Sequence, residues 1–128
     1  MQVSELMLRD VTLVAAEDSV QTAARAIADI DSRFIFVGTD EHIVGILTIR
    51  DILIRLVAAG LDPAATPVMQ VISSSLFTCT EQETANTVAE RMTEHRIEQM
   101  PVLDAGGRLV GVITRRTAAA THLASAPR

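Results

Sequence analysis

One strand-to-helix stretch occurs twice in the chain, and this repeat constrains the fold more than any other feature. Residues 43–51 are Ile-Val-Gly-Ile-Leu-Thr-Ile-Arg-Asp, and residues 109–117 are Leu-Val-Gly-Val-Ile-Thr-Arg-Arg-Thr. Gly45 thus matches Gly111, and Thr48 matches Thr114, 66 residues further on. Each run is apolar and rich in β-branched residues, which is typical of a buried strand. A helical pattern follows each Thr, so both copies predict a strand that leads directly into a helix.

The start of each of these helices is a candidate anion site. The first turn of a helix has backbone N–H groups without helical partners, and it carries the positive end of the helix dipole. Phosphate groups bind at such places. Two copies in one small domain predict a doubled site.

The apolar spacing around the repeat predicts the same β-α-β-β-α order in each half. In the first half we expect strands at 11–15, 34–37 and 43–47 and helices at 20–30 and 48–59. In the second half we expect strands at 76–80, 100–103 and 109–113 and helices at 83–95 and 114–123. The fold class is therefore α/β (α+β), with motif 1 at 1–61, a linker at 62–67 and motif 2 at 68–128. A half of about 60 residues buries little surface alone, so the motifs are expected to pack as one pseudo-symmetric domain.

Composition excludes several classes of function. The net charge is −5, and the only aromatic residues besides His are three Phe, which argues against nucleic-acid binding. All eleven basic residues are Arg, which excludes lysine-dependent phosphate loops and Schiff-base catalysis. No apolar run has the length of a membrane span, and no signal peptide is evident, so we expect a cytoplasmic protein without membrane contact.

The residues with reactive side chains do not form a catalytic pattern. No nucleophile, base and orienting group occur together, so we expect no catalytic residues and no enzyme activity. The single cysteine, Cys79, lies in an apolar stretch and is expected to be a buried, inert thiol. His42, His95 and His122 are scattered, and no metal site is expected.

The motifs resemble those of a tandem cystathionine-β-synthase (CBS) domain pair, also called a Bateman module. The resemblance is carried by Gly45-Ile46-Leu47-Thr48-Ile49-Arg50-Asp51, by the strand Met100-Pro101-Val102, and by the β-α-β-β-α order. It covers nearly the whole chain, as in stand-alone bacterial members of the family. It implies a regulatory protein with no obligatory cofactor. It further implies that an adenosyl ligand (AMP, ATP, S-adenosylmethionine or NAD) binds in clefts between the motifs.

The resemblance also implies which residues bind the ligand. In site 1, Thr48 would contact phosphate or ribose and Asp51 the ribose hydroxyls, while the base would lie near Val11, Thr12, Ile35 and Phe36. In the weaker site 2, Thr114 is the counterpart of Thr48, and the pocket is lined by Phe77, Pro101 and Val102. Two positions depart from the family pattern. Thr117 replaces the ribose-binding Asp, and Ile35 stands where the family usually has Pro.

The residues at the two helix starts also allow a purely structural interpretation. Thr48-x-x-Asp51 has the spacing of a capping box, in which the two residues satisfy each other's backbone N–H groups. Arg50, Arg115 and Arg116 lie in first turns, where a cation opposes the helix dipole. They either accompany a bound anion or are solvated charges. With no carboxylate beside them, Arg115 and Arg116 would make the second junction strongly positive and favour phosphate over ribose.

The helices that follow these junctions predict a homodimer. One carries an apolar stripe wider than a single neighbour covers, formed by Ile49, Ile52, Leu53, Leu56 and Val57. The other carries small or apolar residues that would permit close helix approach, namely Ala118, Ala119, Ala120 and Leu123. Ligand occupancy would then be signalled through conformation or association. The alternatives are a ligand-free CBS dimer that binds an unknown protein partner, and a metal- or redox-responsive module that uses His residues and Cys79.

Overall fold

The computed structural model describes residues 1–72 and 76–119, which form two compact units. The first-repeat unit is Thr12–Leu76. The second-repeat unit combines Met1–Val11 with Phe77–Arg128. Each unit has its own three-stranded sheet and its own cluster of buried apolar side chains.

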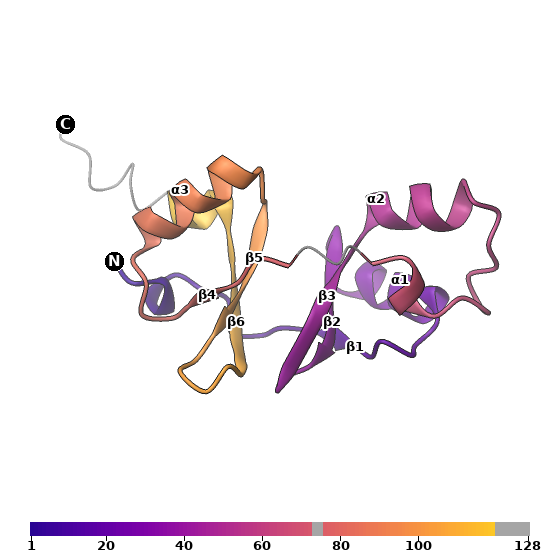
Figure 1. Cartoon of the computed structure of the whole chain (residues 1–128), viewed down its shortest axis with the longest axis horizontal. Coiled ribbons are helices and arrows are strands. Elements are labelled where there is room, and N and C mark those ends of the chain that lie inside the picture. Colours follow the sequence, from indigo (N-terminus) through magenta and orange to yellow (C-terminus); the bar gives the residue numbers. More distant parts are fainter. Residues whose placement is uncertain (73–75, 120–128) are drawn as a thin grey trace. The chain divides into compact units, whose positions relative to one another are not determined.

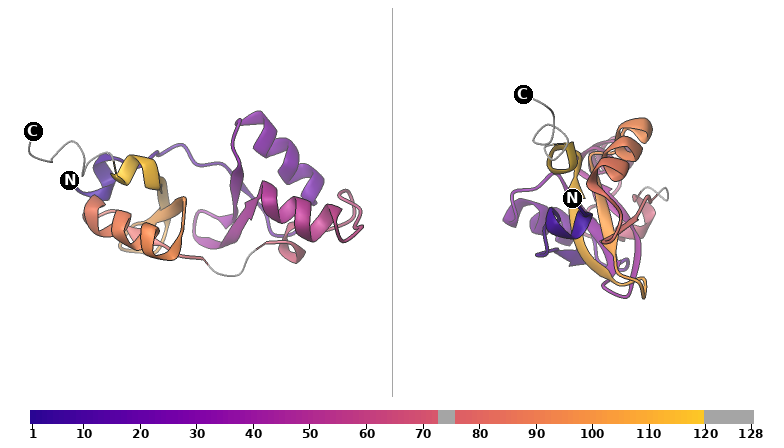
Figure 2. Two further views of the ribbon diagram at one scale, coloured as in Figure 1. Left: turned by 90° about the horizontal axis from the view of Figure 1, so that it is seen from above. Right: turned by 90° about the vertical axis from the view of Figure 1, so that its left-hand side faces the viewer.

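In the first-repeat unit two helical segments cover a mixed sheet. Strand β1 (Leu13–Val14) pairs in parallel with β2 (Phe34–Thr39), and β2 pairs antiparallel with β3 (His42–Thr48). Helix α1 (Val20–Asp29) and the segment formed by α2 (Ile49–Asp51) and η2 (Ile52–Val57) lie on the same side of this sheet (Figures 1 and 2). Their inward side chains pack on those of the strands, and residues after the 3₁₀ turn η3 (Val68–Gln70) complete the core.

The second-repeat unit repeats this arrangement. Strand β4 (Cys79–Thr80) is parallel to β5 (Gln99–Leu103), which is antiparallel to β6 (Leu109–Thr114). Helix α3 (Ala85–His95) and residues 115–119, which are helical, contribute to the core together with the 3₁₀ turn η1 (Val3–Glu5). The predicted mixed fold and its β-α-β-β-α order are therefore confirmed. The part of the last predicted helix beyond residue 119, with Ala120, His122 and Leu123, lies outside the described residues.

Each short 3₁₀ turn packs in the unit of the other repeat. The turn that precedes the first repeat in the sequence packs in the second-repeat unit, and the turn that precedes the second repeat packs in the first-repeat unit. Turn η1 stands at the start of the first repeat but packs in the second-repeat unit, where the Val3 N–H donates to the Glu83 carbonyl at 2.9 Å. Turn η3 makes the matching bond in the first-repeat unit, from the Val68 N–H to the Asp18 carbonyl at 2.8 Å. The compact units consequently begin and end at other residues than the motifs expected from the sequence.

The apolar stripe after Thr48 is divided between the core and the surface. Leu56 is 2% exposed and Ile52 packs against the core, whereas Ile49, Leu53 and Val57 are 44%, 56% and 62% exposed. In the second set of predicted contact residues the structure corrects Ala118, which is fully buried in the core of its own unit, whereas Ala119 is partly exposed. No helix among the described residues is long and apolar enough to cross a membrane.

Candidate functional site

The first junction, between β3 and α2, is closed by a reciprocal pair of hydrogen bonds. The Asp51 N–H donates to Thr48 Oγ1 at 3.1 Å, and the Thr48 N–H donates to Asp51 Oδ2 at 3.0 Å. The predicted capping box is thus confirmed. Both residues are partly buried, and among the described residues no protein group donates to Asp51 Oδ1. This carboxylate can accept further hydrogen bonds at the junction.

The second junction, after β6, has the same hydroxyl cap without a carboxylate. The Thr117 N–H donates to Thr114 Oγ1 at 3.2 Å, and the hydroxyl oxygens of the two threonines lie 2.8 Å apart. Thr117 therefore cannot provide the charged acceptor that Asp51 provides. A neutral hydroxyl forms weaker hydrogen bonds to donors such as ribose hydroxyls than a carboxylate does.

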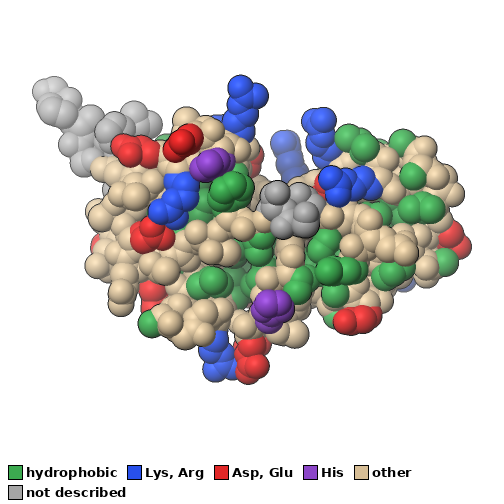
Figure 3. Space-filling view, in the orientation of Figure 1, with side chains coloured by type: hydrophobic (Ala, Val, Ile, Leu, Met, Phe, Trp, Pro, Cys, Tyr) green, Lys and Arg blue, Asp and Glu red, His purple; other side chains and the backbone are tan. Residues whose placement is uncertain are grey.

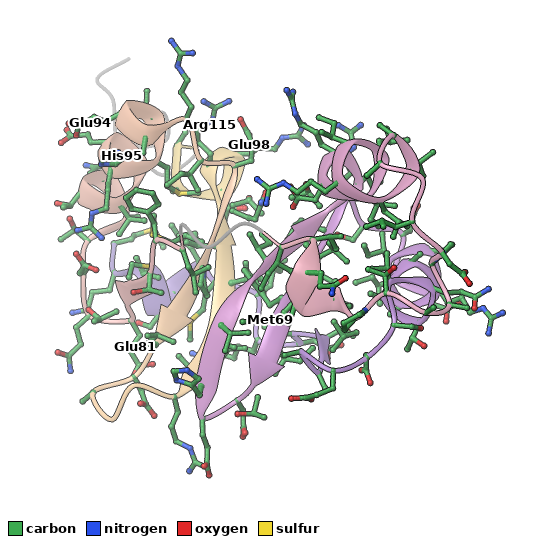
Figure 4. The ribbon with its side chains drawn as sticks, turned by 45° about the vertical axis from the view of Figure 1, so that its right-hand side comes forward. Met69, Glu81, Glu94, His95, Glu98 and Arg115 are labelled. Atoms are coloured by element: carbon green, nitrogen blue, oxygen red, sulfur yellow. The ribbon has the colours of Figure 1, made fainter. Side chains whose placement is uncertain are left out.

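The charges around the second junction differ from the sequence-based expectation. Glu98 Oε1 lies 2.7 Å from Arg115 Nη2, and Figure 4 shows the two side chains together. The prediction of a strongly positive junction without a carboxylate is therefore wrong. At both junctions the first helical N–H donates to a carbonyl just before the middle strand, from Ile49 to Arg33 at 3.0 Å and from Arg115 to Glu98 at 2.8 Å.

This equivalence allows the charges at the two junctions to be compared. The first junction combines Arg33 and Arg50 with Asp51, and the second combines Arg115 and Arg116 with Glu98. Each thus has two cations and one anion, but the carboxylate occupies a different place. Asp51 follows the helix start, whereas Glu98 precedes the strand and is already paired with an arginine.

Two of the residues predicted to flank a base at the first site, Ile35 and Phe36, lie on opposite faces of the sheet. Ile35 is 1% exposed and belongs to the core beneath the helices. Phe36 is also 1% exposed but points to the other face of the sheet, because successive strand residues alternate. Its ring lies 5.4 Å from that of Phe34, edge-on. Thr12 is exposed in the first-repeat unit, whereas Val11 belongs to the second-repeat unit.

Strand register corrects the position assigned to the family's proline. Phe36 pairs with Ile46 in the first-repeat unit, and Pro101 pairs with Val112 in the second. Since Ile46 and Val112 are equivalent in the repeat, the counterpart of Pro101 is Phe36 and not Ile35. Pro101 lies 65 residues after Phe36, but Val112 lies 66 after Ile46, so the second half is one residue longer between these positions. The difference lies in the hairpin, because Thr39 pairs with His42 across a shorter turn than the one between Leu103 and Leu109.

Phe77, a predicted residue of the second site, is involved in an aromatic stack. It is 38% exposed, and its ring lies 4.6 Å from the exposed His95 imidazole with 28° between the planes. Of the other predicted residues, Val102 belongs to the core, and Pro101 is buried outside that cluster. Sequence reasoning missed the contacts of His95 and Glu98. Aligning the two repeats would have drawn attention to Glu98 as a residue of the second junction, because it stands at the position equivalent to Arg33 in the first.

Cys79 has the environment of an inert thiol, as predicted. It is 2% exposed, and burial raises the pKa of its thiol to about 12, with the nearby Glu83 carboxylate acting in the same direction. The reactive thiolate form is therefore suppressed at neutral pH. Within residues 1–72 and 76–119, no three His, Cys, Asp or Glu side chains lie close enough together to hold a metal ion.

Comparison with known sequences finds one family over nearly the whole chain. The sequence model of the CBS domain matches residues 3–58 and again residues 68–120. Hypoxic response protein 1 of Mycobacterium tuberculosis is 30% identical over 111 residues, which are 86% of this chain and 77% of that protein. Homoserine O-acetyltransferase of Methanosphaerula palustris is 32% identical over 88% of this chain, but the matching region is only 22% of the enzyme.

Solved structures show the same fold. The crystal structure of hypoxic response protein I with two coordinated zinc ions has a TM-score of 0.82 at 28% identity, covering 95% of this chain and 98% of that one. The CBS domain pair of protein MJ0100, in complex with 5′-methylthioadenosine and S-adenosylmethionine, has a TM-score of 0.82 at 20% identity. That match covers 98% of both chains, and at this identity it is evidence of the fold alone.

Proposed function

Because the chain belongs to the CBS domain family, with one copy in each half, we propose that it is a regulatory module that senses an adenosine-containing ligand. The ligand is of the AMP, ATP, S-adenosylmethionine or NAD type, and its presence is signalled through conformation or association. The observation that carries the proposal is the first junction, where no group of the described residues donates to Oδ1 of the Asp51 carboxylate beside a helix start. The adenosyl ligands of a protein with the same fold support it.

The residues of the first junction take distinct roles in this proposal. The Asp51 carboxylate accepts hydrogen bonds from the ribose hydroxyls, which present two donors side by side. Thr48 and the exposed Arg50 contact phosphate or ribose oxygen atoms near the helix start. The base lies near Thr12 and Phe36, and Val11 is a further candidate, whereas Ile35 belongs to the core on the opposite face of the sheet and takes no part in binding. The second junction, with Thr114, Arg115, Arg116 and Thr117, binds more weakly because a neutral Thr117 stands at the position of Asp51. The protein itself catalyses no reaction.

A thermal-shift series with a matched pair of variants tests this assignment. AMP, ATP, S-adenosylmethionine and NAD are each added in excess, and a binder at a hundred times its dissociation constant stabilises the fold by about 2.7 kcal/mol. That corresponds to a shift of several degrees in the melting temperature. Asp51→Ala should abolish most of the shift. Asp18→Ala also removes a carboxylate that accepts a backbone N–H of the same unit, and it should retain the shift.

Two results would contradict the proposal. One is the absence of a melting shift with all four compounds. The other is a folded Asp51→Ala protein whose affinity for the active compound, measured by calorimetry, equals that of the wild type. Comparing affinities in folded protein separates ligand binding from the loss of the cap, which itself costs about 1 kcal/mol.

A specific observation favours a second function, that of a homodimer which needs no ligand. Ile49, Leu53 and Val57 form an exposed apolar row, and Ile54 and Leu61 nearby are 52% and 43% exposed. Figure 3 shows apolar side chains on the surface of this unit. Contiguous apolar surface of this kind usually marks an interface. We propose that a second copy of the chain covers it, with equivalent helices facing across a two-fold axis.

Sedimentation of wild type and two variants distinguishes this dimer from a monomer. Leu53→Asp places a charge in the row and should shift the mass towards the single-chain value of 13.8 kDa. Met69→Asp is the control, because Met69 is exposed to almost the same extent (54%) but lies on η3. A wild-type mass of 13.8 kDa at micromolar concentration would contradict the dimer.

A further inference from the structure

The segment that follows the first junction departs from α-helical geometry after a single turn. Helix α2 ends at Asp51, and η2 continues as a π-helix over Ile52–Val57. The Ala58 N–H donates to the Leu53 carbonyl at 2.9 Å, five residues back. The later bond from the Leu61 N–H to the Leu56 carbonyl, at 3.0 Å, belongs to the helix C-cap at Gly60, whose φ is 73°. Such π turns are rare and concentrate at functional positions, because α-helical hydrogen bonding is normally preferred.

Two anchors hold this π turn in place. At its start, the Asp51 carboxylate binds the Thr48 N–H, and the Ile49 N–H binds the Arg33 carbonyl. Within the turn, Arg55 Nη1 donates to the Ile72 carbonyl at 3.1 Å in a partly buried contact. Between these two contacts the chain follows a π-helical path, in which each hydrogen bond spans one residue more than in an α-helix. Release of either anchor lets the chain slide by one position and adopt the α-helical pattern.

The register of η2 decides which apolar side chains reach the surface. In the π register Ile52 and Leu56, four residues apart, face the core, whereas Ile49, Leu53 and Val57 are exposed. An α-helix turns by a larger angle per residue, so side chains beyond the turn would rotate relative to those before it. A change of register therefore alters the exposed apolar row without unfolding the unit.

We propose that η2 is a two-register element, π while Asp51 caps the helix and α when the Asp51 carboxylate is withdrawn. This proposal depends on the proposed function in one respect, namely that the natural trigger of the register change is the adenosine-containing ligand. A ribose diol has two donors, so it takes Asp51 Oδ1 and competes with the Thr48 N–H for Oδ2. Ligand binding thereby weakens the first anchor and shifts the population towards the α register. The apolar surface that a second copy would contact changes as a result.

The register can be read directly by NMR, from scalar couplings across backbone hydrogen bonds in isotopically labelled protein. In wild type the Ala58 N–H should correlate with the Leu53 carbonyl. In Asp51→Ala this correlation should be lost and replaced by one to the Ile54 carbonyl. Asp18→Ala, which removes another capping carboxylate of the same unit, should keep the Leu53 correlation. Persistence of the Leu53 correlation in Asp51→Ala, or its loss in Asp18→Ala, overturns the proposal.

A second variant keeps the test decisive if Asp51→Ala folds poorly. Arg55→Met keeps an unbranched apolar stem and the capping box but removes the guanidinium group that binds the Ile72 carbonyl. In Arg55→Met the hydrogen bond of the Ala58 N–H should likewise move from the Leu53 carbonyl to the Ile54 carbonyl. If the Leu53 correlation is unchanged in this variant, the anchors do not control the register. Deletion of Ile54 removes the additional residue, so this variant should show only hydrogen bonds four residues back, with or without Asp51→Ala.

Addition of AMP to wild type separates this inference from the proposed function. The melting temperature reports binding, and the Ala58 correlation reports the register. A melting shift with an unchanged correlation overturns the ligand-driven switch while the proposed function stands. If none of the four adenosine compounds shifts the melting temperature, the proposed function fails, and the Asp51→Ala spectrum still decides whether the cap controls the register.

Discussion

The two repeat units share a backbone framework but differ in the few side chains that could bind a ligand. Both long helices are followed within two residues by a residue with positive φ, Asp31 at 51° after α1 and Arg96 at 58° after α3. The residue that follows donates its N–H to the carbonyl five residues back, from Ser32 to Ile27 at 3.1 Å in one unit and from Ile97 to Met92 at 2.8 Å in the other. At the junctions, by contrast, Asp51 corresponds to Thr117.

This difference shows that the framework and the site depend on different parts of the sequence. Backbone hydrogen bonds and caps maintain the framework, and many sequences can provide them. The site depends on single charged groups, so one substitution can remove it from one repeat while the fold remains. The two copies can therefore be tested against each other within one chain.

The largest effect is expected from truncating equivalent core residues of the two helices. Ile27 in α1 and Met92 in α3 are 5% and 0% exposed and lie in different apolar clusters. Ile27→Ala and Met92→Ala should each cost about 2–5 kcal/mol. Because the clusters are separate, hydrogen exchange should increase mainly in the unit that carries the substitution. Equal acceleration in both units, in either variant, would show that they unfold together.

The next effect tests the exchange of the N-terminal segment. A Cβ on Gly111 would lie 2.7 Å from the Leu8 carbonyl oxygen and 2.8 Å from Met7 Sδ. Gly111→Ala should therefore displace the segment that contains η1 and cost about 1–3 kcal/mol, measured by urea unfolding. Gly106→Ala is the matched control, because its Cβ would meet only the Asp104 side chain at 3.4 Å. Equal midpoints for the two variants would contradict the importance of this contact.

A smaller effect is expected from making the second junction resemble the first. Thr117→Asp provides a carboxylate three residues after Thr114, which completes a capping box and should raise stability by about 0.5–1 kcal/mol. If a carboxylate is what distinguishes the sites, calorimetry with the ligand that binds wild type should also show a gain in stoichiometry. If Thr117→Asp is stabilised but binds no additional ligand, residues other than the one at position 117 account for the difference in ligand binding between the two junctions.

The smallest effect concerns an ion pair of the second-repeat unit, between Glu83 and Arg91. Glu83 and Asp18 both accept a backbone N–H, from Thr80 at 2.9 Å and from Ala15 at 3.0 Å, but among the described residues Arg91 pairs with Glu83 and no arginine pairs with Asp18. The hydrogen bond from Arg91 lowers the pKa of Glu83 below its ordinary value of 4.5. Arg91→Met should cost about 0.2–1 kcal/mol at neutral pH, since the pair is partly exposed.

The pH dependence follows from the direction of this pKa shift. A carboxyl group with a lowered folded-state pKa adds stability above pH 4.5, and this stability is lost as the pH falls through the folded value. The difference between wild type and Arg91→Met in urea midpoint should therefore be present at pH 7 and shrink below pH 4.5. A difference of constant size at both pH values would mean that Arg91 contributes by packing and not by charge.

The sequence by itself determined the repeat, the order of the elements and the caps. These features depend on neighbours a few residues apart, such as Thr48 with Asp51, so local patterns specify them. The buried thiol of Cys79 was also predictable from its apolar surroundings in the chain. The family resemblance rested on the same local signature, and two matches to the CBS domain support it.

Only the tertiary structure decided which residues meet across longer distances. It paired Glu98 with Arg115, moved η1 to the second-repeat unit, and placed Phe36 at the position equivalent to Pro101. It also divided the stripe after Thr48 into a buried part and an exposed part through the π turn of η2. Strand register, helix register and segment exchange depend on the simultaneous packing of distant side chains. A periodic pattern along one segment cannot specify that packing.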